Sequence, residues 1–199
     1  MKRIGVLALQ GDFAEHLHML QQIPSVEAVL ARTRAELESL DGLILPGGES
    51  TAMGRLLNEE NLMDFLRQKI RSGLPVWGTC AGMILLANTI EGQRETYLGG
   101  MNIQVRRNAY GRQLGSFSAE EACPEAGPGK HHLVFIRAPY IVKTAPSVDV
   151  LMKIDGHITA AREQHMTVTS FHPELTDDLW FHRYFAEQVC SDVRRGKKA

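Results

Sequence analysis

The stretch LPVWGTCAGMILLAN, residues 74–88, sets a single cysteine between two apolar runs. The first run is typical of a strand buried on both faces, and the second predicts a helix that begins near Ala81. Gly78 and Gly82 allow the strand and the helix to approach closely at a sharp turn. Such a turn pushes the side chain of Cys80 clear of the backbone, which a nucleophile needs and a structural thiol does not. The pattern alone leaves a buried structural cysteine as an equal alternative.

Strands and helices alternate through the first half of the chain on both sides of this turn. The expected strands are 3–9, 26–31, 42–46 and 74–78, and the expected helices are 12–23, capped by Asp12, and 58–73. This alternation predicts an α/β fold with three layers, in which helices cover both faces of a mostly parallel, doubly wound sheet.

The second half of the chain consists of short expected strands separated by turns, one of them at 112–117. This pattern predicts that antiparallel strands extend the sheet. Residues 119–132 are rich in proline, glycine and charge, which predicts a surface loop. A last helix is expected from about Asp177 to Arg194. We find no internal repeat and expect one domain over residues 1–199.

The composition is that of an ordinary globular protein, with 44% hydrophobic and 23% charged residues. The formal net charge of −1 gives no reason to expect nucleic acid or a membrane as a partner. The three cysteines form no CxxC pair, which argues against a zinc–thiolate site or a disulfide framework. The apolar run at residues 4–9 is too short for a signal sequence or a membrane span, so we expect a reducing, cytoplasmic location.

A thiol nucleophile needs a base, and His172 is the best candidate among the eight histidines. It follows an expected strand in the sequence FHPE, with Glu174 two residues further on. Functional groups of an open α/β sheet gather where strands end, and a carboxylate beside an imidazole stabilises the imidazolium. Taken alone, FHPE is better explained as a simple turn, and the GTCAG motif reverses that preference. The histidines expected to be solvated or only partly buried are His16, His18, His131 and His132.

A third motif, LPGGEST at residues 45–51, follows another expected strand. Its glycines let backbone N–H groups face a ligand. The lysine and the spacing of a nucleotide-phosphate loop are absent from it. In isolation, the motif is most simply a strand-to-helix turn capped by Ser50 or Thr51.

Taken together and in this order, PGGEST, GTCAGM and FHPE resemble the motifs of the triad-type, class I glutamine amidotransferases. Four further blocks narrow the choice of family within this class: LQGDFAEH (9–16), RRNAYGRQ (106–113), FIRAP (135–139) and FHPELTDD (171–178). They are similar to the glutaminase subunits of pyridoxal 5'-phosphate synthase. The resemblance extends over nearly the whole chain.

The resemblance implies a class I glutamine amidotransferase fold and a Cys–His–Glu triad that hydrolyses L-glutamine. Cys80 would be the nucleophile, His172 the general acid and base, and Glu174 the group that orients His172. The residues implied to bind L-glutamine are Gly48, Glu49, Ser50, Arg107, Ile136 and Arg137. The N–H groups of Gly48 and Ala81 are expected to form the oxyanion hole, and no metal or cofactor is expected.

The resemblance also implies a protein partner, the synthase subunit of a large hetero-oligomer. That subunit would combine the ammonia with ribose 5-phosphate and glyceraldehyde 3-phosphate, and the glutaminase would be poorly active until docked. Two alternatives stay open. The chain could serve another synthase or hydrolyse a different amide, or it could be a non-catalytic regulatory subunit with the same fold.

Overall fold

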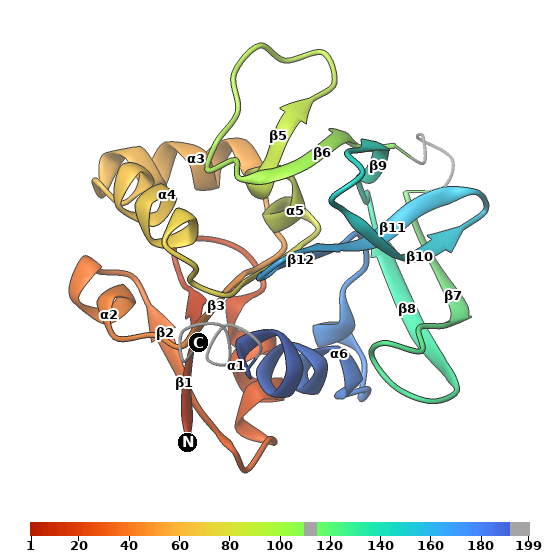
Figure 1. The fold of residues 1–199 in the computed structure, drawn as a ribbon, viewed down its shortest axis with the longest axis horizontal. Coiled ribbons are helices and arrows are strands. Elements are labelled where there is room, and N and C mark those ends of the chain that lie inside the picture. Colours follow the sequence, from red (N-terminus) through yellow and green to blue (C-terminus); the bar gives the residue numbers. More distant parts are fainter. Residues whose placement is uncertain (110–114, 192–199) are drawn as a thin grey trace.

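The computed structural model describes residues 1–109 and 115–191, in which one large sheet and a separate hairpin organise the chain (Figure 1). Within these residues the large sheet has ten strands, in the order β2-β1-β3-β4-β12-β11-β9-β6-β5, and β10 pairs with β11 outside this path. Its strands are β1 (Lys2–Leu7), β2 (Val26–Ala31), β3 (Gly42–Leu45), β4 (Val76–Thr79), β5 (Ala87–Ile90), β6 (Met101–Arg106), β9 (Tyr140–Thr144), β10 (Asp149–Ile154), β11 (His157–Glu163) and β12 (Met166–Thr169). The hairpin consists of β7 (Ser116–Ala122) and β8 (Lys130–Ile136).

The half of the sheet that contains β2, β1, β3, β4 and β12 is parallel. Every residue of β3, β4 and β12 is buried, which explains why β3 and the segment around β4 are apolar runs rather than alternating patterns. The helices are α1 (Phe13–Gln21), α2 (Arg34–Glu38), α3 (Ser50–Glu59), α4 (Met63–Arg71), α5 (Ala81–Leu86), α6 (Trp180–Arg183), the 3-10 helix η1 (Pro173–Leu175) and the π-helix η2 (Tyr184–Val189).

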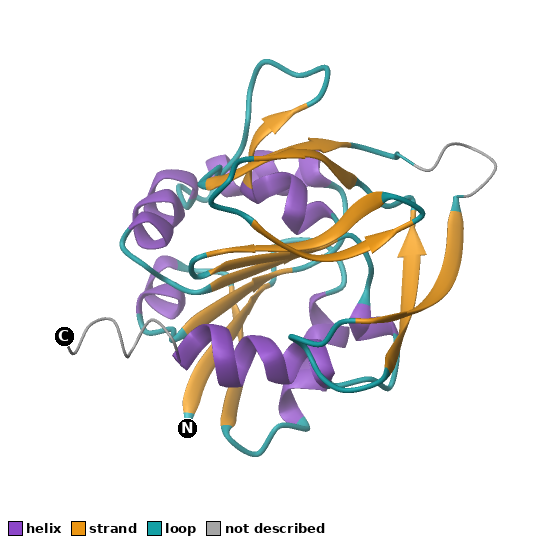
Figure 2. Cartoon of the chain, turned by 45° about the vertical axis from the view of Figure 1, so that its right-hand side comes forward, coloured by secondary structure: helices purple, strands orange, loops and turns teal. Residues whose placement is uncertain are grey.

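Helices cover both faces of the parallel half, so the molecule has three layers (Figure 2). On one face, Leu57 of α3 and Leu85 of α5 belong to the same apolar cluster as Val76 of β4. On the other face, Phe185 of η2 belongs to a second cluster with Trp77, the next residue of β4. Successive side chains of a strand point to opposite faces, so β4 contributes to both clusters. The predicted doubly wound sheet is confirmed.

The other half of the sheet is mostly antiparallel, as predicted, because β11 pairs in that sense with β12, β9 and β10, and β9 with β6. The expected loop at 119–132 is wrong for half of its length. Strands β7 and β8 run into it from both sides and leave a turn at 123–129. Phe117 of β7 stacks on Phe135 of β8 with 4.5 Å between the ring centroids, and Phe135 is fully buried. This packing anchors a hairpin whose other side chains are largely polar.

Several elements were not predicted from the sequence, namely α2, β5 and β9, and α3 was expected only as the helix that follows the turn at 45–51. Helix α2 carries a capping box between Thr33 and Glu36. The expected cap of α1 is also wrong, because the Asp12 side chain makes no capping hydrogen bond. The last helical segment begins at Trp180 rather than at Asp177. The expected end of this helix and the first half of the strand expected at 112–117 lie outside the described residues.

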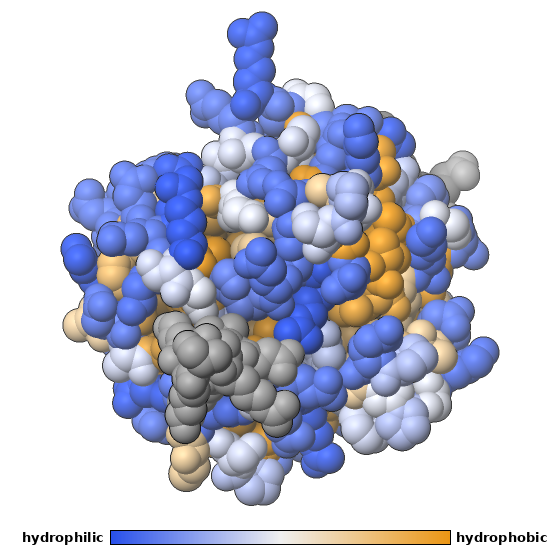
Figure 3. Space-filling view, in the orientation of Figure 1, coloured by the Kyte–Doolittle hydropathy of each residue, from blue (hydrophilic) through white to orange (hydrophobic). Residues whose placement is uncertain are grey.

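Hydrophilic side chains dominate the face of the molecule drawn in Figure 3. An apolar strip crosses its right-hand side, over the region of β9, β10 and β11. Val142 of β9 and Val150 of β10 are among the large apolar residues that remain exposed. In residues 1–109 and 115–191, no helix has the length and apolar character needed to cross a membrane.

The close approach of α5 to the sheet depends on Gly82. A Cβ atom added there would lie 2.1 Å from the backbone oxygen of Leu45, in the centre of the sheet. We therefore expect Gly82→Ala to lower the free energy of unfolding by about 2–3 kcal/mol, as overpacked sites do, in urea denaturation. Gly115→Ala is the matched control, because a Cβ added at Gly115 has no atom within 4 Å. Equal midpoints for the two variants would contradict this account of the turn.

Candidate active site

Cys80 occupies a strained turn between β4 and α5. Its backbone has φ 47° and ψ −100°, in the positive-φ range that residues other than glycine rarely adopt. The turn is attached to the end of β12, because the N–H of Cys80 donates to the Thr169 carbonyl at 2.8 Å. A Cβ atom at Gly78 would lie 2.4 Å from the backbone of Gly82, so the two glycines are what allow the turn. This is the elbow geometry that the sequence predicted.

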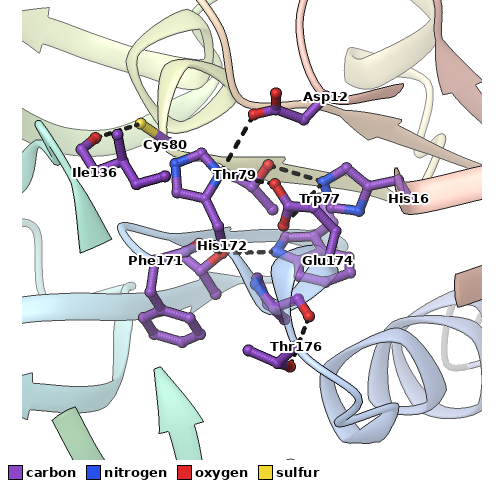
Figure 4. Close-up of polar contacts among 12 residues, drawn as sticks. Asp12, His16, Trp77, Thr79, Cys80, Ile136, Phe171, His172, Glu174 and Thr176 are labelled. Atoms are coloured by element: carbon purple, nitrogen blue, oxygen red, sulfur yellow. Dashed lines mark hydrogen bonds and ion pairs between the residues drawn. The ribbon is translucent and has the colours of Figure 1, made fainter. Parts of the chain in front are cut away.

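His172 reaches the same place from the neighbouring strand. Thr169, the last residue of β12, is paired with Thr79, the last residue of β4, and the two strands are parallel. Their carboxyl ends therefore deliver Cys80 and His172 to one edge of the sheet, where open α/β folds place their functional groups (Figure 4). A hydrogen bond of 2.8 Å from the His172 N–H to the Val134 carbonyl ties this segment to β8.

Glu174 lies behind His172 and orients its ring. Its Oε1 atom lies 2.7 Å from His172 Nδ1, and both side chains are buried. Pro173 fixes the short η1 turn between them. Since Nδ1 faces the carboxylate, Nε2 is the ring nitrogen that is free of Glu174.

The charges of these groups are coupled. Burial alone would lower the pKa of His172, but its contacts with the Cys80 thiol and with Glu174 raise it to about 10. Burial raises the pKa of Glu174, and the contacts with His172 counter that rise. An imidazolium at neutral pH stabilises a thiolate beside it and is ready to donate a proton.

Asp12, which the sequence assigned to a helix cap, is a second carboxylate beside His172. Its Oδ2 atom lies 3.5 Å from His172 Nδ1, on the far side of the ring from the thiol (Figure 4). The ligand atoms of Asp12, His172 and Glu174 lie within 4.8 Å of one another, so these three residues could hold a metal ion. In the structure, His172 Nδ1 is already engaged by Glu174 at 2.7 Å.

A pocket of about 380 Å³ opens in front of Cys80. This volume suits a small ligand. The pocket-lining residues that the sequence singled out are Gly48, Glu49, Ser50, Cys80, Ala81, Arg107, Ile136, Arg137 and His172. Glu174 is not part of the lining, as expected for a group that acts through His172.

Opposite charges face each other in this pocket. Arg107 Nη2 lies 3.2 Å from Glu49 Oε1 and 3.4 Å from Thr51 Oγ1. Glu49 also caps α3, because its carboxylate accepts the N–H groups of Thr51 at 3.1 Å and Ala52 at 2.6 Å. The cap expected at Ser50 or Thr51 is therefore wrong. Burial raises the pKa of Glu49, but these N–H groups and Arg107 lower it by more.

The two expected oxyanion-hole residues, Gly48 and Ala81, both line the pocket together with Cys80. Ala81 is the first residue of α5, where a backbone N–H has no acceptor within the helix. Gly48 has φ 152°, and a Cβ there would lie 2.6 Å from Gln10 Oε1. The carbonyl of Gly47 accepts the N–H of Asp12 at 3.1 Å, which fixes the Gly47–Gly48 peptide in this structure.

Comparison with known families matches residues 6–191 to the SNO glutamine amidotransferase family. The chain belongs to this family. A relative in Ruminiclostridium cellulolyticum, named pyridoxal 5'-phosphate synthase subunit PdxT, is 54% identical over 189 residues, which are 95% of this chain and 100% of that protein. A protein of the same name in Clostridium botulinum is 52% identical over 192 residues, covering 96% of this chain and 100% of its own.

Solved structures show the fold to which the chain belongs. A crystal structure of a glutamine amidotransferase has a TM-score of 0.88 and 42% identity, with 94% of this chain and 98% of that chain covered. PurLQS from Thermotoga maritima shares the fold at 15% identity and a TM-score of 0.62, over 99% of this chain and 100% of the other. The predicted class I glutamine amidotransferase-like fold is confirmed.

Some pocket residues of this SNO family member were missed by sequence reasoning. Gln10 accepts the N–H of Glu49 at 2.8 Å and so braces the turn that carries the pocket glycines. Its block LQGDFAEH was noticed, but nothing in the local pattern shows that it meets residues 45–51. Asn108 and Leu175 also line the pocket, each one residue away from a predicted group.

Proposed function

We propose that this chain is one glutaminase domain that hydrolyses L-glutamine and supplies the ammonia to a pyridoxal 5'-phosphate synthase subunit. The observation that carries the proposal is the pocket itself, which unites the Cys80 elbow, the His172–Glu174 pair and the Glu49–Arg107 charges. Relatives more than 50% identical over their full length bear the name of a subunit of that synthase.

The charges at the mouth of the pocket suit an amino acid. The carboxylate of Glu49 complements an α-ammonium group, and the guanidinium of Arg107 complements an α-carboxylate. The existing ion pair between them is partly exposed, so little is lost when a zwitterion inserts between its members. Gly48, Ser50, Ile136 and Arg137 would complete the contacts with glutamine.

Hydrolysis begins with attack by the Cys80 thiolate on the side-chain amide carbon of glutamine. The oxygen of the tetrahedral intermediate is stabilised by the N–H groups of Ala81 and Gly48. His172 Nε2 donates its proton to the departing nitrogen, ammonia leaves and a glutamyl thioester remains on Cys80. His172, now neutral, accepts a proton from water as the water attacks the thioester, and glutamate is released.

The ammonia must reach the synthase subunit without passing through bulk water, where it would become ammonium and lose its nucleophilicity. The synthase subunit would dock on the glutaminase, receive the ammonia directly and combine it with ribose 5-phosphate and glyceraldehyde 3-phosphate. The reaction needs no metal and no cofactor in the glutaminase, because the thiol, the imidazole and the backbone N–H groups supply each step.

The test is glutamate release from glutamine, measured with and without the synthase subunit from an organism of one of the named relatives. We expect release that the partner stimulates, and none from asparagine, whose amide carbon falls one methylene short of Cys80. A rate of glutamate release that the partner does not change would assign the chain to another synthase. A folded chain that releases no glutamate in any mixture would indicate a non-catalytic subunit.

A further inference from the structure

His16 is completely buried, contrary to the solvated or partly buried position expected for it. It lies on the inner face of α1 with no exposed surface, and its ring meets Trp77 edge-on at a centroid distance of 5.5 Å. His182 of α6, also completely buried, lies beside both rings. Fully buried histidines are uncommon, and two in contact behind a catalytic pair call for an explanation.

The polar atoms of His16 connect His182 to the triad carboxylate. His16 Nδ1 lies 3.0 Å from His182 Nε2. On the opposite side of the ring, His16 Nε2 lies 3.0 Å from Thr79 Oγ1 and 3.4 Å from Glu174 Oε2 (Figure 4). Glu174 Oε2 is buried and makes no regular hydrogen bond within the described residues, so this ring faces the otherwise uncompensated oxygen.

The contacts select one arrangement of protons. If His182 Nε2 carries a proton and donates it to His16 Nδ1, then His16 carries its own proton on Nε2, between Thr79 and Glu174. His182 Nδ1, which has no hydrogen-bond partner within the described residues, is then a bare acceptor. In the opposite arrangement, His182 Nδ1–H becomes a buried donor without an acceptor, and a lone pair of His16 faces the carboxylate. Both features are unfavourable.

Both histidines act as neutral dipoles rather than as charges. Burial, together with His182 and His172, holds the pKa of His16 well below its usual value, and burial lowers the pKa of His182 to about 3. The ionisable groups around His16 are His182 from α6, His172 and Glu174 from the segment after β12, and Asp12 at the start of α1.

We propose that His16, fixed in its Nε2–H form by His182, is a positioning residue that keeps Glu174 ionised and aimed at His172. The inference rests on the proposed glutaminase function, because Glu174 acts only through that triad. Burial raises the pKa of Glu174, and a protonated Glu174 could no longer stabilise the imidazolium. The contact of His172 with Oε1 counters part of that rise, and an N–H dipole from His16 on Oε2 counters more of it.

The resting protein offers a direct test that needs no activity. Nitrogen-15 NMR of the imidazoles distinguishes a protonated ring nitrogen from a bare one. At neutral pH we expect the rings of His16 and His182 to be neutral and protonated at Nε2. The signals of His16 are assigned as those that disappear from the spectrum of His16→Leu. A His16 ring protonated at Nδ1 would overturn the inference, whatever the outcome of the glutaminase assay.

The kinetic test uses variants that differ in one donor. His16→Leu fills the space without an N–H group, and His16→Gln restores an N–H close to the position of Nε2. We expect His16→Leu to lower kcat about 10- to 100-fold, the range for a hydrogen bond to a charged group, with little change in KM. The acid limb of the pH profile should move to higher pH, because Glu174 then accepts a proton more readily. His16→Gln should recover part of both effects.

Controls separate this role from simple packing and from failure of the proposed function. His18 lies on the exposed side of the same helix, and His18→Leu should change neither kcat nor the pH profile. If His16→Leu and His16→Gln lose activity equally with an unmoved acid limb, His16 is structural and the inference fails. If the native chain with its synthase partner releases no glutamate, the proposed function fails instead, and NMR still decides the state of His16.

Discussion

Cys80→Ala is expected to abolish glutamate release while leaving the fold intact. The side chain contributes little to stability, since the thiol makes only a long contact of 3.9 Å with the Ile136 carbonyl and a contact with His172, which Glu174 still holds when the sulfur is removed. The backbone bond from Cys80 to Thr169 does not depend on the side chain. Without the sulfur no thioester forms, and loss of a triad nucleophile lowers kcat by about 10⁴- to 10⁶-fold.

The measurement is partner-stimulated glutamate release by the native chain and the variant, with thermal unfolding to verify the fold. Cys123→Ala is the matched control, because burial raises the pKa of the Cys123 thiol and so keeps it protonated and unreactive. Its activity should remain close to that of the native chain. Substantial release by Cys80→Ala would remove Cys80 from the role of nucleophile.

Glu174→Gln is the second change with a large expected effect, a loss of about 10²- to 10⁴-fold in kcat. Glutamine keeps the shape of the side chain but carries no charge and can turn an N–H₂ group toward His172 Nδ1. The imidazole then takes the wrong tautomer, the effect that the equivalent change has in serine proteases. Because the carboxylate helps to raise the pKa of His172 to about 10, its removal should also lower that pKa. The basic limb of the pH profile should therefore move to lower pH.

A second Glu–His pair provides the control for this change. Glu120 Oε1 lies 2.6 Å from His132 Nδ1 on the exposed β7–β8 hairpin, with the same atoms in contact as in the triad. Glu120→Gln removes that contact outside the pocket and should leave kcat and the pH profile unchanged. If Glu174→Gln were as active as Glu120→Gln, the triad would reduce to a Cys–His pair.

The sequence predicts best what depends on neighbouring residues. The turn at Cys80 needs glycines at 78 and 82 for reasons that are local, so the motif located both the elbow and the start of α5. The buried strands on either side are short apolar runs, and their alternation with helices fixed the type of sheet. The position of His172 beside Cys80 could be predicted because each residue follows a parallel strand, and the strands β4 and β12 end at the same edge of the sheet.

Contacts between distant segments could not be predicted in this way. Asp12 stands where a helix cap usually stands, and only the approach of residue 172 makes its carboxylate part of the site. His16 is buried because Trp77 and His182 pack against it from strands and helices far along the chain. His131 was also expected to be solvated, but it is buried, and its Nδ1 lies 2.7 Å from Asp178 Oδ2. This contact too joins segments that are far apart in the sequence.

The hairpin at β7 and β8 shows a different limit. The composition of residues 119–132 is that of a loop, and every second side chain of β7 is exposed, so the apolar signal of a strand is weak. The hairpin forms because Phe117 stacks on Phe135 within it, and Phe135 meets Phe171 of the main body edge-on with 5.7 Å between the ring centroids. The cap at Glu49 was missed for a related reason, since Ser50 and Thr51 are more usual capping residues and only the longer carboxylate reaches both N–H groups.

The most direct test of the central claim is mass spectrometry of the protein mixed with glutamine and its synthase partner and quenched in acid during turnover. The account predicts a peptide containing Cys80 that is heavier by one glutamine less one ammonia, the mass of a glutamyl thioester. The adduct should disappear in Cys80→Ala. Turnover with no adduct in the native chain, or with an adduct on another residue, would contradict it.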